Sequence, residues 1–159
     1  MSLSDKIFGN YTRNNQRRIR NMVKEVKRTI NYYKKKGISK EQISKRSKTL
    51  MAAIRSGKTT VEDNIIEATA LCYLAAEQAL NISFYDVQIE AALAMREGTI
   101  AEVKTGEGKT YIQIIEAYLN ALDGKGVHVI TANDYLIGRD LKETQPVYDL
   151  LGLTSSVVY

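Results

Sequence analysis

The chain has 159 residues, of which 44% are hydrophobic, and this length and composition suit one packed domain. It contains no run of about 18 apolar residues that could span a membrane, and residues 1–6 lack the apolar region of a secretory signal, so we expect a cytoplasmic protein. Cys72 is the single cysteine, which excludes an intramolecular disulfide, and the apolar residues around it predict a buried thiol.

The net charge of +5 conceals a strong asymmetry along the chain. Residues 1–60 contain 17 of the 23 Lys and Arg residues and only three acidic residues, whereas residues 61–159 contain six basic and 15 acidic residues. Such a basic segment attracts an acidic partner, which could be anionic lipid, nucleic acid or an acidic protein face, or it forms a solvated helical face. Its helical spacing and few aromatic residues do not favour base stacking on nucleic acid.

The first sixty residues predict two helices. Over residues 11–36, apolar side chains recur at spacings that place them on one helical face, and Lys36-Gly37 ends that helix. Ser39 then has the sequence context of an N-cap, and the helix that it starts continues past Ile54 to a break at residues 56–58.

Two further helices follow. Residues 59–62 have a capping-box pattern, which predicts a helix to about Ala79. Ser83 is the expected cap of the next helix, which runs to Arg96 and is followed by Gly98.

From residue 99 the pattern alternates between strand-like and helix-like segments. We expect a strand over residues 99–103, a turn over 104–109, a helix over 110–122, a strand over 126–131, a helix from Asn133 or Asp134 to Leu151, and a strand over 154–159. Pro146 would divide the last helix into two pieces. Alternation of this kind predicts an α/β fold with a parallel sheet and right-handed crossovers.

The turn after the first expected strand has the composition of a phosphate-binding loop, Thr105-Gly106-Glu107-Gly108-Lys109-Thr110. Gly106 and Gly108 would let the backbone curl around phosphate oxygens at the start of a helix. Lys109 would reach the β and γ phosphates of a nucleoside triphosphate, and the Thr110 hydroxyl would coordinate Mg²⁺. Val103 stands where the strict motif has its first glycine. The alternative to a phosphate-binding loop is a glycine-rich turn in which Gly-Lys-Thr occurs by chance.

Residues 84–88 begin the helix that precedes this loop and could recognise the base. The Gln88 amide offers an acceptor and two donors, which match the edge of adenine, and Phe84 or Tyr85 could stack on the ring. The alternative is an exposed glutamine beside core aromatic residues.

Four segments, residues 84–88, 100–110, 117–122 and 124–136, closely resemble the SecA family, the ATPase motors of bacterial protein export. The resemblance covers nearly the whole chain, although residues 10–60 match only loosely. It implies a motor with two RecA-like domains of the superfamily 2 type, with ATP bound between them. Residues 1–60 would then be a basic helical arm, and residues 61–159 the first part of the first nucleotide-binding domain, truncated before the Walker B strand.

The resemblance also implies roles for individual residues. Gln88 takes the place of the family's adenine-reading glutamine, and Tyr85 stands beside the base where phenylalanine is usual. Residues 105–110 take the place of the phosphate loop, with Lys109 and Thr110 as its catalytic residues and Thr110 as the Mg²⁺ ligand. Departures such as Val103 and Ile115-Glu116 indicate a divergent or accessory member of the family.

The family's activity implies partners for a full-length protein. ATP hydrolysis would drive preproteins through the SecY channel, with the motor in the cytoplasm and peripherally on the inner face of the cell membrane, and a homodimer is left open. The first ten residues, with Leu3, Ile7 and Phe8, form an amphipathic turn suited to an anionic membrane surface. No Asp-Glu pair follows the third expected strand, so we expect this chain by itself to bind ATP weakly without turning it over.

Two alternatives remain at this point. A superfamily 2 nucleic-acid helicase would use the basic arm to grip phosphates, but residues 123–136 resemble SecA, whereas helicases usually carry Pro-Thr-rich or Arg-rich segments there. The other alternative is a non-catalytic, nucleotide-sensing protein.

Overall fold

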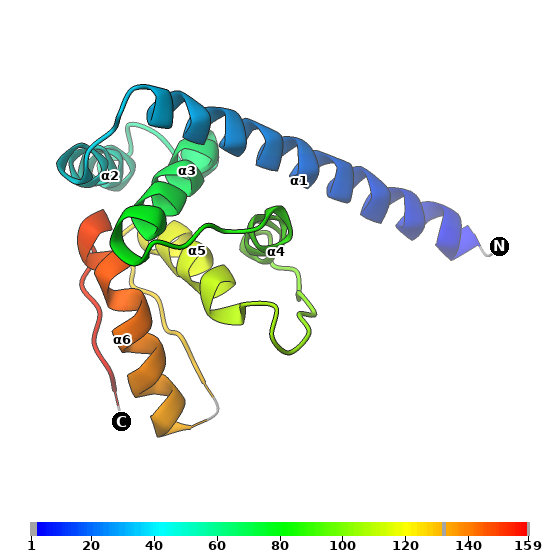
Figure 1. Cartoon of the computed structure of the whole chain (residues 1–159). Coiled ribbons are helices and arrows are strands. Elements are labelled where there is room, and N and C mark those ends of the chain that lie inside the picture. The colour runs from blue at the N-terminus through cyan, green and yellow to red at the C-terminus, as the bar shows by residue number, and fades with distance from the viewer. Residues whose placement is uncertain (1–2, 132, 159) are drawn as a thin grey trace.

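The computed structural model describes the backbone of residues 3–131 and 133–158, and the side chains of residues 14–131 and 133–158. The side chains predicted to form the N-terminal amphipathic turn, Leu3, Ile7 and Phe8, lie outside that description. The described helices, in chain order, are α1 (Leu3–Lys35), α2 (Lys40–Arg55), α3 (Val61–Leu80), α4 (Asp86–Arg96), α5 (Lys109–Ala121) and α6 (Asp134–Leu151). Figure 1 shows α1 as a long rod that extends well past the other helices. Each helix that the sequence predicts is therefore confirmed.

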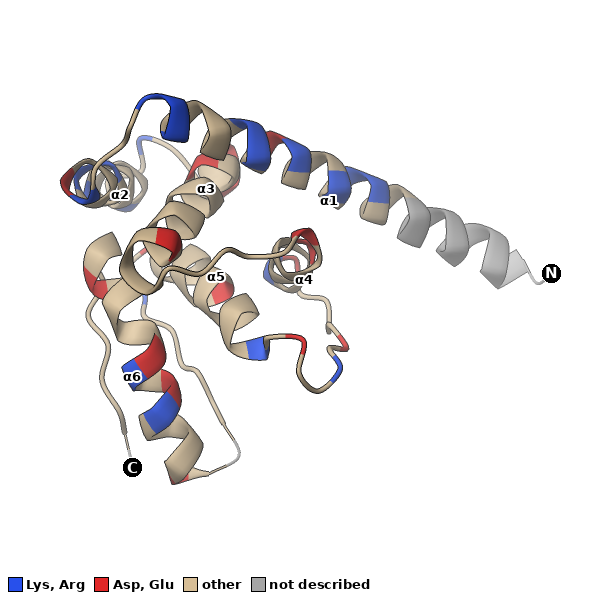
Figure 2. Cartoon of the chain, viewed as in Figure 1, with Lys and Arg blue, Asp and Glu red and all other residues tan. Residues whose placement is uncertain are grey.

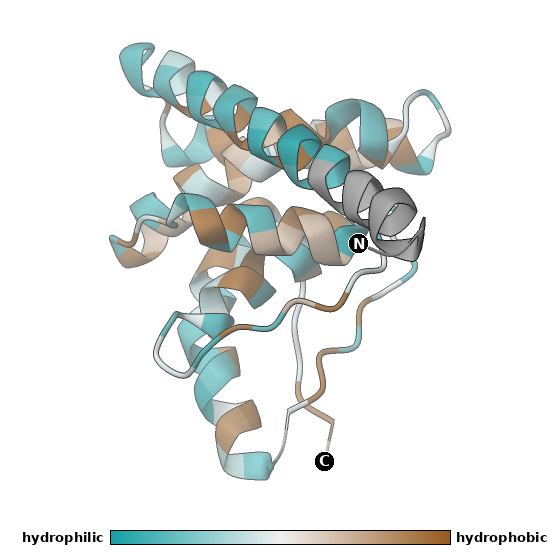
Figure 3. Ribbon diagram, turned by 90° about the vertical axis from the view of Figure 1, so that its right-hand side faces the viewer, coloured by the Kyte–Doolittle hydropathy of each residue, from teal (hydrophilic) through white to brown (hydrophobic). Residues whose placement is uncertain are grey.

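The predicted α/β class with a parallel sheet is wrong for the described residues. Residues 99–103, 126–131 and 154–158 connect or follow helices without regular secondary structure, and within 3–131 and 133–158 no strand is formed. Ile100 is fully exposed, Ile130 is 90% exposed and Val158 is 85% exposed, and Figure 3 shows hydrophobic residues along these segments. A strand needs backbone partners on a neighbouring strand, and an alternating or apolar pattern encodes only the extended shape.

Local side-chain hydrogen bonds explain where α2 and α3 begin. The predicted cap Ser39 is confirmed: its hydroxyl accepts a bond from the Gln42 N–H, and the Gln42 side chain accepts one from the Ser39 N–H. The box at the start of α3 is shifted by one residue from the prediction, because Thr60 pairs with Asp63. Both helices thereby satisfy amide groups that have no partner within the helix.

Two predictions about helix ends are wrong. Tyr85, not Ser83, occupies the N-cap position of α4, and the side chain of Gln88 accepts a hydrogen bond from the Tyr85 N–H. Pro146 does not divide α6, which continues from Asp134 to Leu151. Pro146 lies on the exposed side of this helix, where water can solvate the carbonyl that loses its bond, while Val147 and Leu151 remain buried.

The core is built around α3, which packs against α1, α2, α5 and α6. Small side chains on α3, including Ala68, Ala70, Ala75 and Ala76, are fully buried and allow close approach of the neighbouring helices. Cys72 is also fully buried, which confirms the prediction for the thiol. None of the described helices has the length and apolar character required to cross a membrane.

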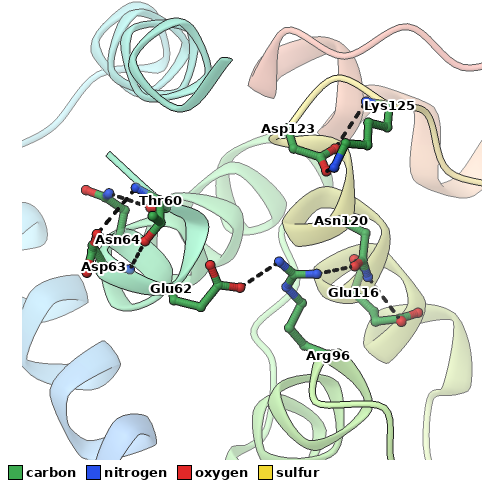
Figure 4. Close-up of polar contacts among 9 residues, drawn as sticks. All are labelled: Thr60, Glu62, Asp63, Asn64, Arg96, Glu116, Asn120, Asp123 and Lys125. Carbon is green, nitrogen blue, oxygen red and sulfur yellow. Dashed lines mark hydrogen bonds and ion pairs between the residues drawn. The ribbon is translucent and has the colours of Figure 1, made fainter. Parts of the chain in front are cut away.

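Arg96 joins three helices at the C-terminal end of α4, as Figure 4 shows. One guanidinium nitrogen donates to the Asn120 side-chain oxygen on α5 at 2.7 Å, and another donates to Glu62 at the start of α3 at 2.9 Å. Asn120 in turn donates to the backbone carbonyl of Glu116. This end of α4 is therefore tied to both neighbouring helices.

Candidate nucleotide-binding site

The loop predicted to bind phosphate connects residues 99–103 to the start of α5. Gly106 has a φ of 86° and Gly108 a φ of 77°, so both adopt the left-handed conformation that favours glycine. Gly108 is the N-cap of α5, and Lys109 and Thr110 are its first two residues. The first amide groups of a helix have no acceptor within it and carry the positive end of the helix dipole, which suits them to an anion.

Gly108 is also closely packed. A Cβ atom at this position would lie 2.5 Å from Nε2 of Gln88 and 3.0 Å from a ring carbon of Tyr111. The side chain of Gln88 thus lies directly against the loop. At Gly106 no atom lies within 4 Å of the corresponding position, so that only the backbone conformation calls for glycine there.

Gln88 is buried, with 3% of its surface exposed, so the alternative of an exposed glutamine is wrong. Its amide nitrogen donates to the carbonyl oxygen of Glu107 at 2.9 Å, and its amide oxygen accepts from the Tyr85 N–H at 3.0 Å. The residue predicted to read the base therefore connects the start of α4 with the phosphate loop. A bound base would compete with these two backbone partners for the amide.

The two aromatic candidates for base stacking have different surroundings. Phe84 is buried, and its ring centroid lies 5.8 Å from that of Tyr73 and 6.3 Å from that of Tyr111. Tyr85 is 73% exposed and lies next to Gln88 at the start of α4. Phe84 is a core residue, and Tyr85 is the one with a ring face accessible to a ligand.

The structure brings most of the predicted site residues to one region. Thr105, Gly106, Glu107 and Lys109 are exposed, while Gly108 and Thr110 are half-buried. The hydrogen bond from Gln88 to Glu107 connects this loop to Tyr85 and α4. An exposed lysine, flexible glycines and a helix N-terminus at one place can hold a polyphosphate.

The basic arm contacts this site, which the sequence does not predict. Lys27 on α1 donates to both carboxylate oxygens of Asp86, the first residue of α4, at 2.9 and 3.0 Å. Asp86 lies between Tyr85 and Gln88 in the chain. The opposite charges of residues 1–60 and 61–159 indicate attraction between the two segments, but they do not specify this pair.

Comparisons with known proteins agree with the resemblance of the motifs. Residues 4–159 match the SecA DEAD-like domain. "Protein translocase subunit SecA" of Clostridium botulinum (strain Eklund 17B / Type B) is 37% identical over 158 residues, which cover 99% of this chain and 18% of that protein. The proteins of the same name from Stutzerimonas stutzeri (strain A1501) and Sulfurimonas denitrificans are 37% and 34% identical, over 98% and 99% of this chain and 17% and 18% of their own lengths.

The match to the SecA DEAD-like domain thus extends over nearly all of the chain, which spans less than a fifth of the length of these relatives. It includes residues 105–110 and both partners of the contact between Gln88 and Glu107. The chain belongs to the SecA DEAD-like domain family.

Proposed function

We propose that this chain is the ATP-binding part of a SecA-type motor that couples ATP hydrolysis to the translocation of preproteins. The single observation that carries the proposal is the arrangement of residues 105–110 at the start of α5, with Gln88 hydrogen-bonded to the Glu107 carbonyl. The names of the relatives, protein translocase subunits, support the coupling to translocation. Those names do not favour the helicase alternative.

The residues present fit ATP with Mg²⁺. The amide groups of residues 106–110 and the ammonium of Lys109 would hold the phosphates, and the Thr110 hydroxyl would bind Mg²⁺, which neutralises phosphate charge when bound. Gln88 would exchange its backbone partners for the edge of adenine, with the exposed ring of Tyr85 beside the base. The loop thereby provides binding and orientation of the phosphates.

We expect the 159-residue chain to bind ATP without turning it over, whereas a full-length relative would be an ATPase. Hydrolysis requires acidic and basic groups that hold Mg²⁺, orient water and stabilise the developing charge. The described residues form no sheet that would bring such groups from another strand to the loop. A steady-state phosphate-release assay on the purified chain should remain at background, and clear turnover would contradict this part of the proposal.

The proposed partners of a full-length motor are the SecY channel, preproteins and an anionic membrane surface, with nucleic acid disfavoured and a homodimer left open. The proposed location is the cytoplasm and the inner face of the cell membrane. Within this chain, residues 1–60 would be the partner-binding arm and residues 61–159 the nucleotide-binding part. In vesicle flotation, the chain should bind anionic vesicles more strongly than neutral ones and less strongly at high salt, since each basic residue near the surface contributes about 1 kcal/mol. Binding that depends on neither the charge of the vesicles nor the salt concentration would contradict the membrane role.

Calorimetric titration with ATP and with GTP tests the central part of the proposal. The two ligands share the triphosphate and differ at the base edge that Gln88 would contact. We expect the chain to bind ATP more tightly than GTP in the presence of Mg²⁺. Absence of ATP binding would contradict a nucleotide site, and equal affinity would contradict the assignment of Gln88 to adenine.

A further inference from the structure

The basic helix α1 is joined to α4 by ion pairs along the whole length of α4. Figure 2 shows basic residues along α1 and acidic residues on the part of α4 nearest to it. The pairs are Lys27 with Asp86 at the start of α4, Arg20 with Glu90 in its middle, and Arg18 with Glu97 at its C-cap. A fourth pair, Lys34 with Glu77 at 2.6 Å, joins α1 to α3.

The contact between Lys27 and Asp86 differs from the others in its position. The Lys27 ammonium lies within 3.0 Å of both carboxylate oxygens of Asp86. Asp86 directly follows Tyr85, whose N–H bonds to Gln88, and it precedes Gln88 by two residues. A shift of Asp86 would therefore move the groups that face the base.

The two ends of α4 are held by different contacts. Its C-terminal end is tied to α3 and α5 through Arg96, which bonds to Glu62 and Asn120. At its N-terminal end, the described side-chain hydrogen bond between α4 and the phosphate loop is the one from Gln88 to the Glu107 carbonyl. The pair with Lys27 is thus placed to fix the end of α4 that carries the base-recognition residues.

We propose that Lys27 and Asp86 form a positioning pair that holds Tyr85 and Gln88 in place for the base of the nucleotide. This inference rests on the proposed function, because it assigns a role within the same site. No described hydrogen bond or ion pair joins either residue to the phosphate loop, so the pair acts on base recognition and leaves phosphate binding unchanged. The Lys27 and Asp86 side chains are 53% and 54% exposed, and an exposed pair of this kind has a modest effect, about two- to fivefold in affinity.

The test compares ATP with inorganic tripolyphosphate, which carries a similar charge but no base. Lys27→Glu places a carboxylate opposite Asp86 and should weaken ATP binding about fivefold, while tripolyphosphate binding changes less than about twofold. Because both ligands are polyanions, the general effect of the charge change appears in both titrations. The charge swap Lys27→Glu with Asp86→Lys should restore ATP binding.

Arg28→Glu is the matched control. It reverses a charge next to Lys27 on the same helix and breaks an exposed pair, but its partner Glu25 lies on α1 itself, so this pair joins α1 to no other helix. The control should leave the ratio of ATP to tripolyphosphate affinity at the wild-type value. Equal losses for both ligands in Lys27→Glu, the same ratio change in Arg28→Glu, or no rescue by the swap would overturn the inference.

Amide hydrogen exchange separates this inference from the proposed function. In the protein without ligand, Lys27→Glu should speed exchange at the Tyr85 N–H, and Arg28→Glu should not. If the wild-type chain bound neither ATP nor tripolyphosphate, the proposed function would fail, and the exchange at Tyr85 would still decide whether Lys27 positions this end of α4. Unchanged exchange in Lys27→Glu would overturn the positioning role.

Discussion

The side-chain nitrogen of Gln88 lies 2.9 Å from the carbonyl oxygen of Glu107, and this hydrogen bond joins the start of α4 to the loop that begins α5. The same amide accepts a bond from the Tyr85 N–H, so that both its ends are engaged with the backbone. In this arrangement the Gln88 amide supports the loop, and the proposed contact with a base edge would require it to release its backbone partners. We therefore expect the proposed base binding and a change in loop contacts to occur together.

Gln88→Ala should weaken ATP binding and loosen the loop. It removes the bond to Glu107 and the contacts that a base would make, and the loss of a hydrogen-bonded partner of this kind corresponds to about a five- to tenfold loss of affinity. Calorimetric titration measures the affinity, and amide exchange over residues 104–110 measures the loop. Gln145→Ala, at an exposed position on α6, is the control and should bind ATP as the wild type does. Wild-type affinity in Gln88→Ala would contradict the role of this side chain.

Alanine substitutions at the two loop glycines should differ in cost. Gly106→Ala meets only the strain of a positive φ and should lower the free energy of unfolding by about 1 kcal/mol. At Gly108 the added Cβ would also collide with the Gln88 amide, so Gly108→Ala should cost about 2–3 kcal/mol and disturb the Tyr85 N–H. Chemical denaturation gives both values. Equal costs would mean that Gln88 does not pack against the loop in solution.

The hydrogen bond from Tyr33 to Glu67 predicts a loss of stability in strongly alkaline solution. The Tyr33 hydroxyl donates to a Glu67 carboxylate oxygen at 2.7 Å. Burial and this bond to an anion raise the pKa of Tyr33 to about 12. An unfolded tyrosine loses its proton near pH 10, so the stabilisation by Tyr33 is complete below about pH 10 and is lost as the pH rises to about 12.

Urea denaturation of the wild type and of Tyr33→Phe at pH 9 and pH 11.5 measures this loss. The advantage of the wild type over Tyr33→Phe should shrink by about 1–2 kcal/mol between the two pH values. Tyr32→Phe, at the exposed neighbouring position, should keep the wild-type pH dependence. An advantage that is constant or grows with pH would contradict the assigned hydrogen bond.

The Cys72 thiol should be unreactive in the native protein. The side chain is fully buried on α3, and burial raises the pKa of the thiol above its ordinary value, which suppresses the reactive thiolate. A chromogenic disulfide reagent should react slowly in buffer and rapidly after unfolding in guanidinium. Rapid reaction in buffer would show that α3 is open to solvent.

Helices were predictable here because apolar spacing and capping residues are local features. The spacing of apolar residues such as Ile19, Val23 and Leu71 predicts the buried faces of α1 and α3. Ser39 caps α2, as its sequence context indicates. The predicted sheet was wrong because it rested on local pattern alone. The apolar runs around Ile100 and Ile130 encode an extended backbone, but pairing depends on other strands that local pattern does not contain.

The candidate site likewise contains residues that local motifs predict and contacts between distant residues that they do not predict. The glycine, lysine and threonine of the loop follow from a contiguous motif, and Gln88 was assigned from a short segment nearby. The pair of Lys27 with Asp86 joins residues 59 positions apart, and the pattern of charges in two helices does not specify which of many cations meets which acid. The same holds for Arg96, whose partners Glu62 and Asn120 come from two different helices.

The most direct test of the central claim is the affinity for ATP with Mg²⁺ in the wild type, Lys109→Ala and Lys104→Ala, measured by calorimetry. Both variants remove one positive charge from the same exposed segment, but only Lys109 stands at the first position of α5, where the phosphates would bind. We predict a loss of at least about tenfold in Lys109→Ala and a change within about threefold in Lys104→Ala. Wild-type affinity in Lys109→Ala, or equal losses in the two variants, would contradict a phosphate-binding loop at residues 105–110.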